Sequence, residues 1–332
     1  MRSIHIDHQR FGAGGSMLDN PWHGRIDEED GDKGLRWHQV INRKKHTRSA
    51  ALQGFECDLG VAENKGRVGA ADGPDSIRKA LANYAWHCDI DVFDSGNSYA
   101  TKDLTQSQLA YSDVITTLLQ QHNMAIGLGG GHEIALGSYN GLANALPQAN
   151  IGIINIDAHF DLRAPSPNPS SGTPFWQIHQ QCIQEQKPFH YACLGVAKTA
   201  NTRALFDYAN TSGTHYLLDT QCVERNFETV LAPMLKAVDQ IYLTICLDAF
   251  PASIAPGVSA PAGLGISPMW VIQLIEWLAS VKSQFQFDWP LMDIAEMNPQ
   301  FDSNGTTAKL AARLIDECLQ ANFNAPEHHD IG

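Results

Sequence analysis

The sequence predicts an α/β protein: a three-layer α/β/α sandwich with a mainly parallel, eight-stranded sheet. Short apolar runs that are typical of buried strands recur eight times between residues 50 and 293. Segments of helical period separate most of these runs. Strands that alternate with helices favour a parallel sheet with both faces covered.

The elements follow one another without a repeat or a low-complexity linker. Residues 1–48 are polar, and we expect them to form an N-terminal extension that wraps the domain. A single domain is expected over residues 49–325, followed by a C-terminal tail over residues 326–332. The expected helices include residues 73–81 and 107–120. The expected strands lie near residues 50–57, 89–95, 123–129, 150–157, 190–196, 214–219, 240–248 and 286–293.

The composition excludes several classes of protein. The 332 residues carry a formal charge of −13, which argues against binding to nucleic acid or to an anionic membrane. No apolar run reaches the length of a membrane span, and the N-terminus does not resemble a secretory signal. The 7 cysteines are scattered and form no CxxC pair, so we expect a reducing, cytoplasmic location. An anionic small-molecule substrate would need a locally placed cation.

The segment Asp157-Ala158-His159-Phe160-Asp161 directly follows an apolar run over residues 151–156. Alternate positions of an extended chain point the same way, so these two carboxylates and the imidazole can converge. Such a set suits a hard or borderline divalent cation such as Mn²⁺. The alternative is that these residues only cap the next helix.

Three further polar side chains come just after predicted strands: His132, Asp248 and Glu296. The carboxyl ends of parallel strands meet at one edge of a sheet, where sites of α/β proteins form. The glycines before His132 do not have the spacing of a phosphate-binding loop, and they indicate close backbone approach. A glycine-rich turn with a core histidine, and a helix-start role for Glu296, are the alternatives.

The chain resembles the ureohydrolase family, which includes arginase and agmatinase, and within it the formimidoylglutamase subfamily. The resemblance covers nearly everything from about residue 20 onward. The motifs that carry it are GGGH (129–132), DAHFD (157–161), residues 247–261, DIAEMNP (293–299), WHGRID (22–27), LRWHQ (35–39), NKGRVGA (64–70), SGTPF (171–175) and LGV (194–196).

The resemblance implies a metal-dependent amidinohydrolase with a two-manganese centre. His132 and Asp161 would bind one metal, His159 and Asp248 the other, and Asp157 would bridge them. The implied reaction is hydrolysis of N-formimidoyl-L-glutamate to L-glutamate and formamide by a metal-bound hydroxide, a step of histidine degradation.

Further roles follow from the same resemblance. Glu296 would face the amidine group of the substrate, and Glu296 and Asp161 would be the catalytic residues. Arg163 falls where arginases hold the α-carboxylate of the substrate. Arginases and agmatinases have a histidine where this chain has Ser171, and the formimidoylglutamase subfamily shares the serine. We also expect a homo-oligomer.

One departure from the family concerns Cys246, which stands where the family has its second bridging aspartate. A cysteine is soft and short, and it cannot span two metals as a carboxylate does. We therefore expect one or partial manganese occupancy rather than two ions per chain. The alternatives are that Cys246 only packs at the strand end, that the substrate is agmatine or a guanidino acid, or that the chain is a non-catalytic family member.

Overall fold

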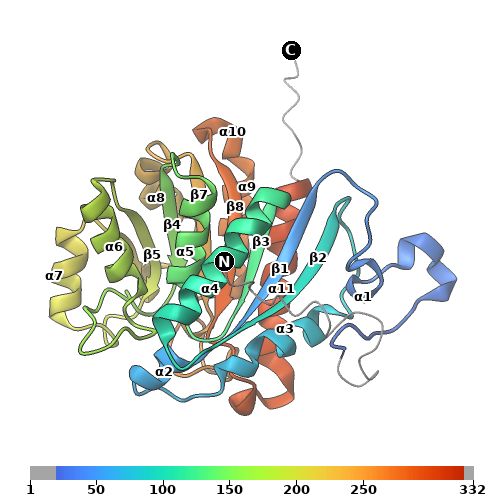
Figure 1. Ribbon diagram of the computed structural model, residues 1–332, viewed down its shortest axis with the longest axis horizontal. Helices are drawn as coiled ribbons and strands as arrows, with labels where there is room; N and C mark the ends of the chain where they lie inside the picture. The colour runs from blue at the N-terminus through green and yellow to red at the C-terminus, as the bar shows by residue number, and fades with distance from the viewer. Residues whose placement is uncertain (1–19, 325–332) are drawn as a thin grey trace, which may run out of the picture.

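The computed structural model describes residues 20–324, and residues 1–19 and 325–332 lie outside this part. The first nineteen residues of the expected extension, and the expected tail over residues 326–332, therefore receive no structural description. In the described chain eight strands form a single sheet with helices on both faces (Figure 1). The strands are β1 (Ser49–Glu56), β2 (Asp91–Tyr99), β3 (Met124–Gly129), β4 (Ile151–Ile156), β5 (His190–Val196), β6 (His215–Leu218), β7 (Gln240–Cys246) and β8 (Asp288–Ala295).

The sheet has the order β2-β1-β3-β8-β7-β4-β5-β6, and each pair of neighbours is parallel. The predicted eight-stranded, mainly parallel sheet is confirmed, with strand ends shifted by a few residues. Strands β3 and β4 are buried along their whole length, which explains why they are continuous apolar runs rather than alternating ones. The four central strands are β3, β8, β7 and β4, so the consecutive strands β3 and β4 are separated in the sheet by β8 and β7.

Helices form the two outer layers of the sandwich. One apolar cluster combines alternate strand residues such as Leu52 and Ile154 with helices α3, α8, α9 and α11. A second cluster combines the intervening strand residues, such as Ala51 and Ile153, with helices α4 to α7. The helices are α1 (Trp37–Val40), α2 (Leu59–Glu63), α3 (Gly73–Leu81), α4 (Leu104–Gln121), α5 (Ile134–Ala145), α6 (Pro174–Glu185), α7 (Arg203–Thr211), α8 (Phe227–Leu235), α9 (Pro268–Ser280), α10 (Lys282–Phe285) and α11 (Thr306–Asn324).

Local sequence explains where the longer helices begin. The side chain of Asp103 accepts a hydrogen bond of 3.1 Å from the backbone N–H of Gln106 at the start of α4. Asp302 does the same for two N–H groups at the start of α11, those of Thr307 and Ala308. Within residues 20–324, no helix combines the length and the apolar character that a membrane span requires.

The described part of the N-terminal segment, residues 20–48, packs on the domain through two tryptophans. Trp22 and Trp37 stack with ring centroids 6.4 Å apart. The indole N–H of Trp22 donates to Asp94 at 2.7 Å, and that of Trp37 donates to Asp316 on α11 at 2.8 Å. Because Trp37 is fully buried in the same cluster as α3 and α11, this segment contributes to the core.

Candidate metal centre and active site

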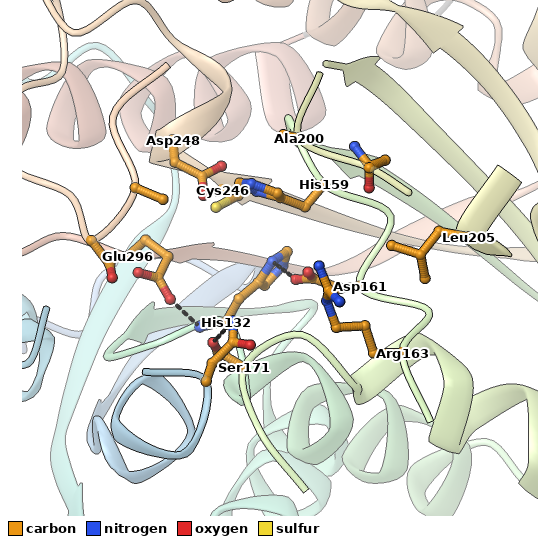
Figure 2. A pocket seen from close by; sticks show the side chains of 14 residues that line it. His132, His159, Asp161, Arg163, Ser171, Ala200, Leu205, Cys246, Asp248 and Glu296 are labelled. Atoms are coloured by element: carbon orange, nitrogen blue, oxygen red, sulfur yellow. Dashed lines mark hydrogen bonds and ion pairs between the residues drawn. The ribbon is translucent and has the colours of Figure 1, made fainter. Parts of the chain in front are cut away.

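The site residues singled out from the sequence meet at the carboxyl edge of the four central strands (Figure 2). His132 follows β3, Asp157 follows β4, Cys246 ends β7, and Glu296 follows β8. All of these except Asp157 line a cavity of about 220 Å³. The cavity is lined by Asn64, His132, His159, Asp161, Arg163, Ser171, Ala200, Asn201, Leu205, Cys246, Asp248, Ser259, Ala260 and Glu296.

His132 is the centre of one half of the cluster. Its Nδ1 lies 2.9 Å from Asp157 Oδ2 and 2.9 Å from Asp161 Oδ2, and it makes no hydrogen bond. Its Nε2 is hydrogen bonded with Thr244 Oγ1 at 3.0 Å, which fixes the orientation of the ring. A histidine held through one nitrogen, with the other turned toward carboxylates, is typical of a metal ligand.

His159 is the centre of the other half. Its Nδ1 lies 3.1 Å from Asp248 Oδ2 and 3.4 Å from Asp157 Oδ1. Asp157 therefore presents one carboxylate oxygen to each histidine, which is the geometry of a bridging ligand. Donor atoms of Asp157, His159 and Asp248 all lie within 4.8 Å of one another, and so do those of His132, Asp157 and Cys246.

This donor set fits a pair of divalent cations. Nitrogen and oxygen donors converge from two sides on a shared carboxylate, as in two-metal hydrolytic sites. The structure brings together all six residues that the sequence offered as metal ligands, including Cys246, whose sulfur lies on the side of His132. Cys246 departs from a wholly hard set, because sulfur suits softer cations than Mn²⁺.

The electrostatics of the cluster favour positive charge. The charge of Asp248 is the main reason that the pKa of His159 is raised to about 12. Burial lowers the pKa of His132, but the carboxylates of Asp157 and Asp161 outweigh it and raise this pKa well above its ordinary value. Three carboxylates in a buried space thus stabilise positive charge at the place where a cation would bind.

Glu296 faces the same cavity from the end of β8. Its Oε1 accepts a hydrogen bond of 3.0 Å from the backbone N–H of His132, and its buried Oε2 has no hydrogen-bond partner. Burial, and then the charges of Asp248 and Glu133, raise the pKa of Glu296 to about 8. Since Glu296 starts no helix, the alternative of a helix-start residue is not supported.

Two non-glycine residues of the site have left-handed backbone conformations. They are Asp161, with a φ of 47°, and Glu296, with a φ of 71°. Such a conformation costs about 1–3 kcal/mol and persists only where the surrounding structure imposes it. At both positions it turns a carboxylate from the strand end into the cavity (Figure 2).

The glycines before His132 allow the close approach that the sequence indicated. A Cβ atom on Gly130 would lie 1.8 Å from the carbonyl oxygen of Cys57. The backbone of Gly130 donates to Phe55 and accepts from Glu296, so it joins the ends of β1 and β8. The glycines serve to place His132, and a phosphate-binding role is not supported.

Arg163 and Ser171 also line the cavity (Figure 2). Arg163 is exposed, and its guanidinium forms no ion pair among residues 20–324. The backbone N–H of Arg163 donates to Gly172, and Ser171 accepts a hydrogen bond of 3.2 Å from the amide of Asn64. The two ends of the long loop, at Arg163 and Ser171, therefore line the cavity.

Sequence reasoning missed four polar residues of the site. Asn64, Asn201 and Ser259 line the cavity, and Thr244 orients His132. Asn64 and Ser259 stand inside segments that carried the family resemblance, which was the available signal. Thr244 and Asn201 carry no local pattern that separates them from ordinary polar residues.

The fold and the site define an α/β/α enzyme with a candidate two-cation centre at the carboxyl edge of its sheet. The model of the arginase family matches residues 48–320. The chain belongs to the arginase family, and it is a hydrolase of amidine C–N bonds.

Individual relatives and structures agree with this placement. The chain is 46% identical over 306 residues to a formimidoylglutamase of Hahella chejuensis, which covers 88% of this chain and 92% of the relative. It is 45% identical over 306 residues to a formimidoylglutamase of Aeromonas salmonicida, covering 89% and 96%. The crystal structure of Trypanosoma cruzi formiminoglutamase with Mn²⁺ matches the fold with a TM-score of 0.78 at 19% identity, covering 88% of this chain and 100% of that one.

Proposed function

We propose that this protein hydrolyses N-formimidoyl-L-glutamate to L-glutamate and formamide. The observation that carries the proposal is the charge pattern of the cavity, which combines an acidic floor with an exposed guanidinium on its wall. The substrate has a matching pattern, with a basic formimidoyl group at one end and two carboxylates at the other. The names of the relatives at 46% and 45% identity support the same substrate.

The reaction requires one water molecule. The water oxygen forms a bond to the amidine carbon, and the bond between that carbon and the glutamate nitrogen breaks. The departing nitrogen takes up a proton and leaves as the amine, while the carbon retains its other nitrogen in formamide. The enzyme must therefore position the amidine, accept a proton from water and return a proton to the amine.

The side chains of the cavity supply these functions in the proposal. Glu296 offers its free, buried Oε2 to the N–H groups of the amidine. Asp161, beside His132, accepts the proton from water. Arg163 binds a substrate carboxylate, and Ser171, held by Asn64, contacts the same end of the substrate. The buried walls limit the access of other water molecules.

We further propose that Mn²⁺ is a cofactor, with one or partial occupancy because of Cys246. His132, Asp157, Asp161 and Cys246 would hold one cation, and Asp157, His159 and Asp248 the other. When bound, such cations act as Lewis acids and lower the pKa of water toward neutrality.

A substrate comparison tests the proposal. The purified protein is supplied with Mn²⁺, and product release is measured from formimidoylglutamate, agmatine and arginine. We expect kcat/KM for formimidoylglutamate to exceed the other values by at least about a hundredfold, because agmatine presents an ammonium to Arg163 and arginine presents one carboxylate with an ammonium beside it, whereas formimidoylglutamate presents two carboxylates. Faster turnover of agmatine would reject the substrate, and no turnover of any of the three would favour a non-catalytic member.

A further inference from the structure

Cys246 supplies the only sulfur donor among the candidate ligands. It ends β7, its side chain is 1% exposed, and its sulfur lies with donor atoms of His132 and Asp157 inside a span of 4.8 Å. His132 is itself 1% exposed, and its Nδ1 makes no hydrogen bond although it points into this group. A buried imidazole nitrogen that makes no hydrogen bond, and that lies 2.9 Å from an oxygen of Asp157 and 2.9 Å from an oxygen of Asp161, has the surroundings of a cation ligand.

The two halves of the centre differ in the chemistry of their donors. The group of Asp157, His159 and Asp248 offers nitrogen and oxygen only. The group of His132, Asp157 and Cys246 offers nitrogen, oxygen and sulfur. Thiolates select softer cations such as Zn²⁺ and Co²⁺, whereas carboxylates suit Mn²⁺.

We infer that Cys246 makes the centre asymmetric, with a thiophilic divalent cation such as Zn²⁺ in the half that contains His132 and Mn²⁺ in the half that contains His159. This inference rests on the proposed function, because both halves belong to the proposed hydrolytic centre. The sulfur serves one half only, because Cys246 is absent from the group formed by Asp157, His159 and Asp248.

Binding through sulfur requires that the thiol of Cys246 loses its proton. A cation that binds the sulfur replaces the thiol proton, which passes to solvent, and the S–H bond gives way to a metal–sulfur bond.

The first experiment uses Co²⁺ as a spectroscopic probe. The full-length protein is stripped of metal and titrated with Co²⁺ while the near-ultraviolet absorption is recorded. We expect a sulfur-to-cobalt charge-transfer band that saturates at one equivalent per chain and disappears on addition of Zn²⁺. The same titration of Cys246→Ala and Cys246→Ser should give no band.

Cys318→Ala is the matched control, because Cys318 is also fully buried but lies in α11, outside the candidate ligand groups. It should give the native band. A native protein without the band, or a band that persists in the two Cys246 variants, would overturn the inference. Circular dichroism of each variant identifies a folding failure. If the Ala and Ser variants fail to fold, Cys246→Asp, which restores the family carboxylate, serves as a second variant without the sulfur.

The second experiment measures selectivity. Native protein and Cys246→Asp are equilibrated with mixtures of Zn²⁺ and Mn²⁺, and the bound metals are determined by elemental analysis. Nitrogen and oxygen sites also prefer Zn²⁺ over Mn²⁺ to a degree, so the difference between the two proteins is the decisive quantity. We expect the preference for Zn²⁺ over Mn²⁺ to fall at least roughly tenfold in Cys246→Asp. Tenfold is the lower end of the loss in metal affinity that substitutions near a metal site cause. Equal preferences would contradict the inference.

Neither measurement depends on turnover, so the two proposals fail separately. A cobalt–sulfur band without release of formamide would leave the asymmetric centre standing and reject the substrate. Release of formamide by a protein that binds two Mn²⁺ ions tightly and shows no band would leave the substrate standing and reject the role of Cys246.

Discussion

Removal of the Arg163 guanidinium should weaken substrate binding while leaving the chemical step largely intact. Arg163 lines the cavity, is exposed, and has no ion-pair partner within residues 20–324, so its charge is available to a ligand. A lost charge-assisted contact costs about 1.5–3 kcal/mol. Each tenfold change in affinity corresponds to about 1.4 kcal/mol. Arg163→Ala should therefore raise KM by roughly one to two orders of magnitude, and solvent screening at this exposed position favours the lower value.

The assay is steady-state release of formamide over a range of formimidoylglutamate concentrations. Arg163→Lys should lie between the native protein and Arg163→Ala, because an ammonium keeps the charge but not the planar fork. Arg203→Ala is a suitable control, because Arg203 is exposed at the start of α7 and does not line the cavity. An unchanged KM with a collapsed kcat in Arg163→Ala would show that this residue takes part in the chemistry, and the assignment would be rejected.

Three further predictions concern the metal and the core. Exhaustive chelation should abolish turnover and added Mn²⁺ should restore it, and turnover by a protein shown to be free of metal would reject a metal-dependent mechanism. Thr244→Val removes the hydroxyl that orients His132, and metal affinity measured by competition should fall about 10–100-fold, with Thr244→Ser close to native. Trp37→Ala should lower the free energy of unfolding by about 3–5 kcal/mol in urea titrations, because a fully buried indole is removed and Asp316 loses its donor. Met269→Ala, at a side chain that is 61% exposed, should change it by less than about 0.5 kcal/mol, and equal losses in the two variants would refute the argument.

The strands were predictable because a buried strand has an apolar sequence pattern that can be recognised locally. Strands β3 and β4 are buried on both faces, so each is a short, continuous apolar run that ends in polar residues. The placement of His132, Asp157 and Glu296 was predictable from the same pattern, since Asp157 and Glu296 directly follow such runs and His132 comes three residues after one. A parallel sheet then brings the strand ends to one edge, whatever the order of the strands.

The strand order and several contacts were not predictable in this way, because they depend on packing between distant segments. Nothing local in the sequence places β8 between β3 and β7. Thr244 lies inside β7, and its contact with His132 exists only because β7 and β3 flank β8 in that order. The side of the cluster on which the sulfur of Cys246 lies is likewise set by the three-dimensional arrangement of the strand ends.

The candidate ligands stand at or after the ends of β3, β4 and β7, and the folded sheet brings these ends together although β8 and β7 separate β3 from β4. A cation bound between them would therefore act as a removable cross-link, formed in the native protein and broken on unfolding. A ligand that binds only the native state at a hundred times its Kd adds about 2.7 kcal/mol to stability. The melting temperature at fixed metal concentrations would thus report how tightly each cation is held, in the native protein and in every variant proposed above, without any substrate.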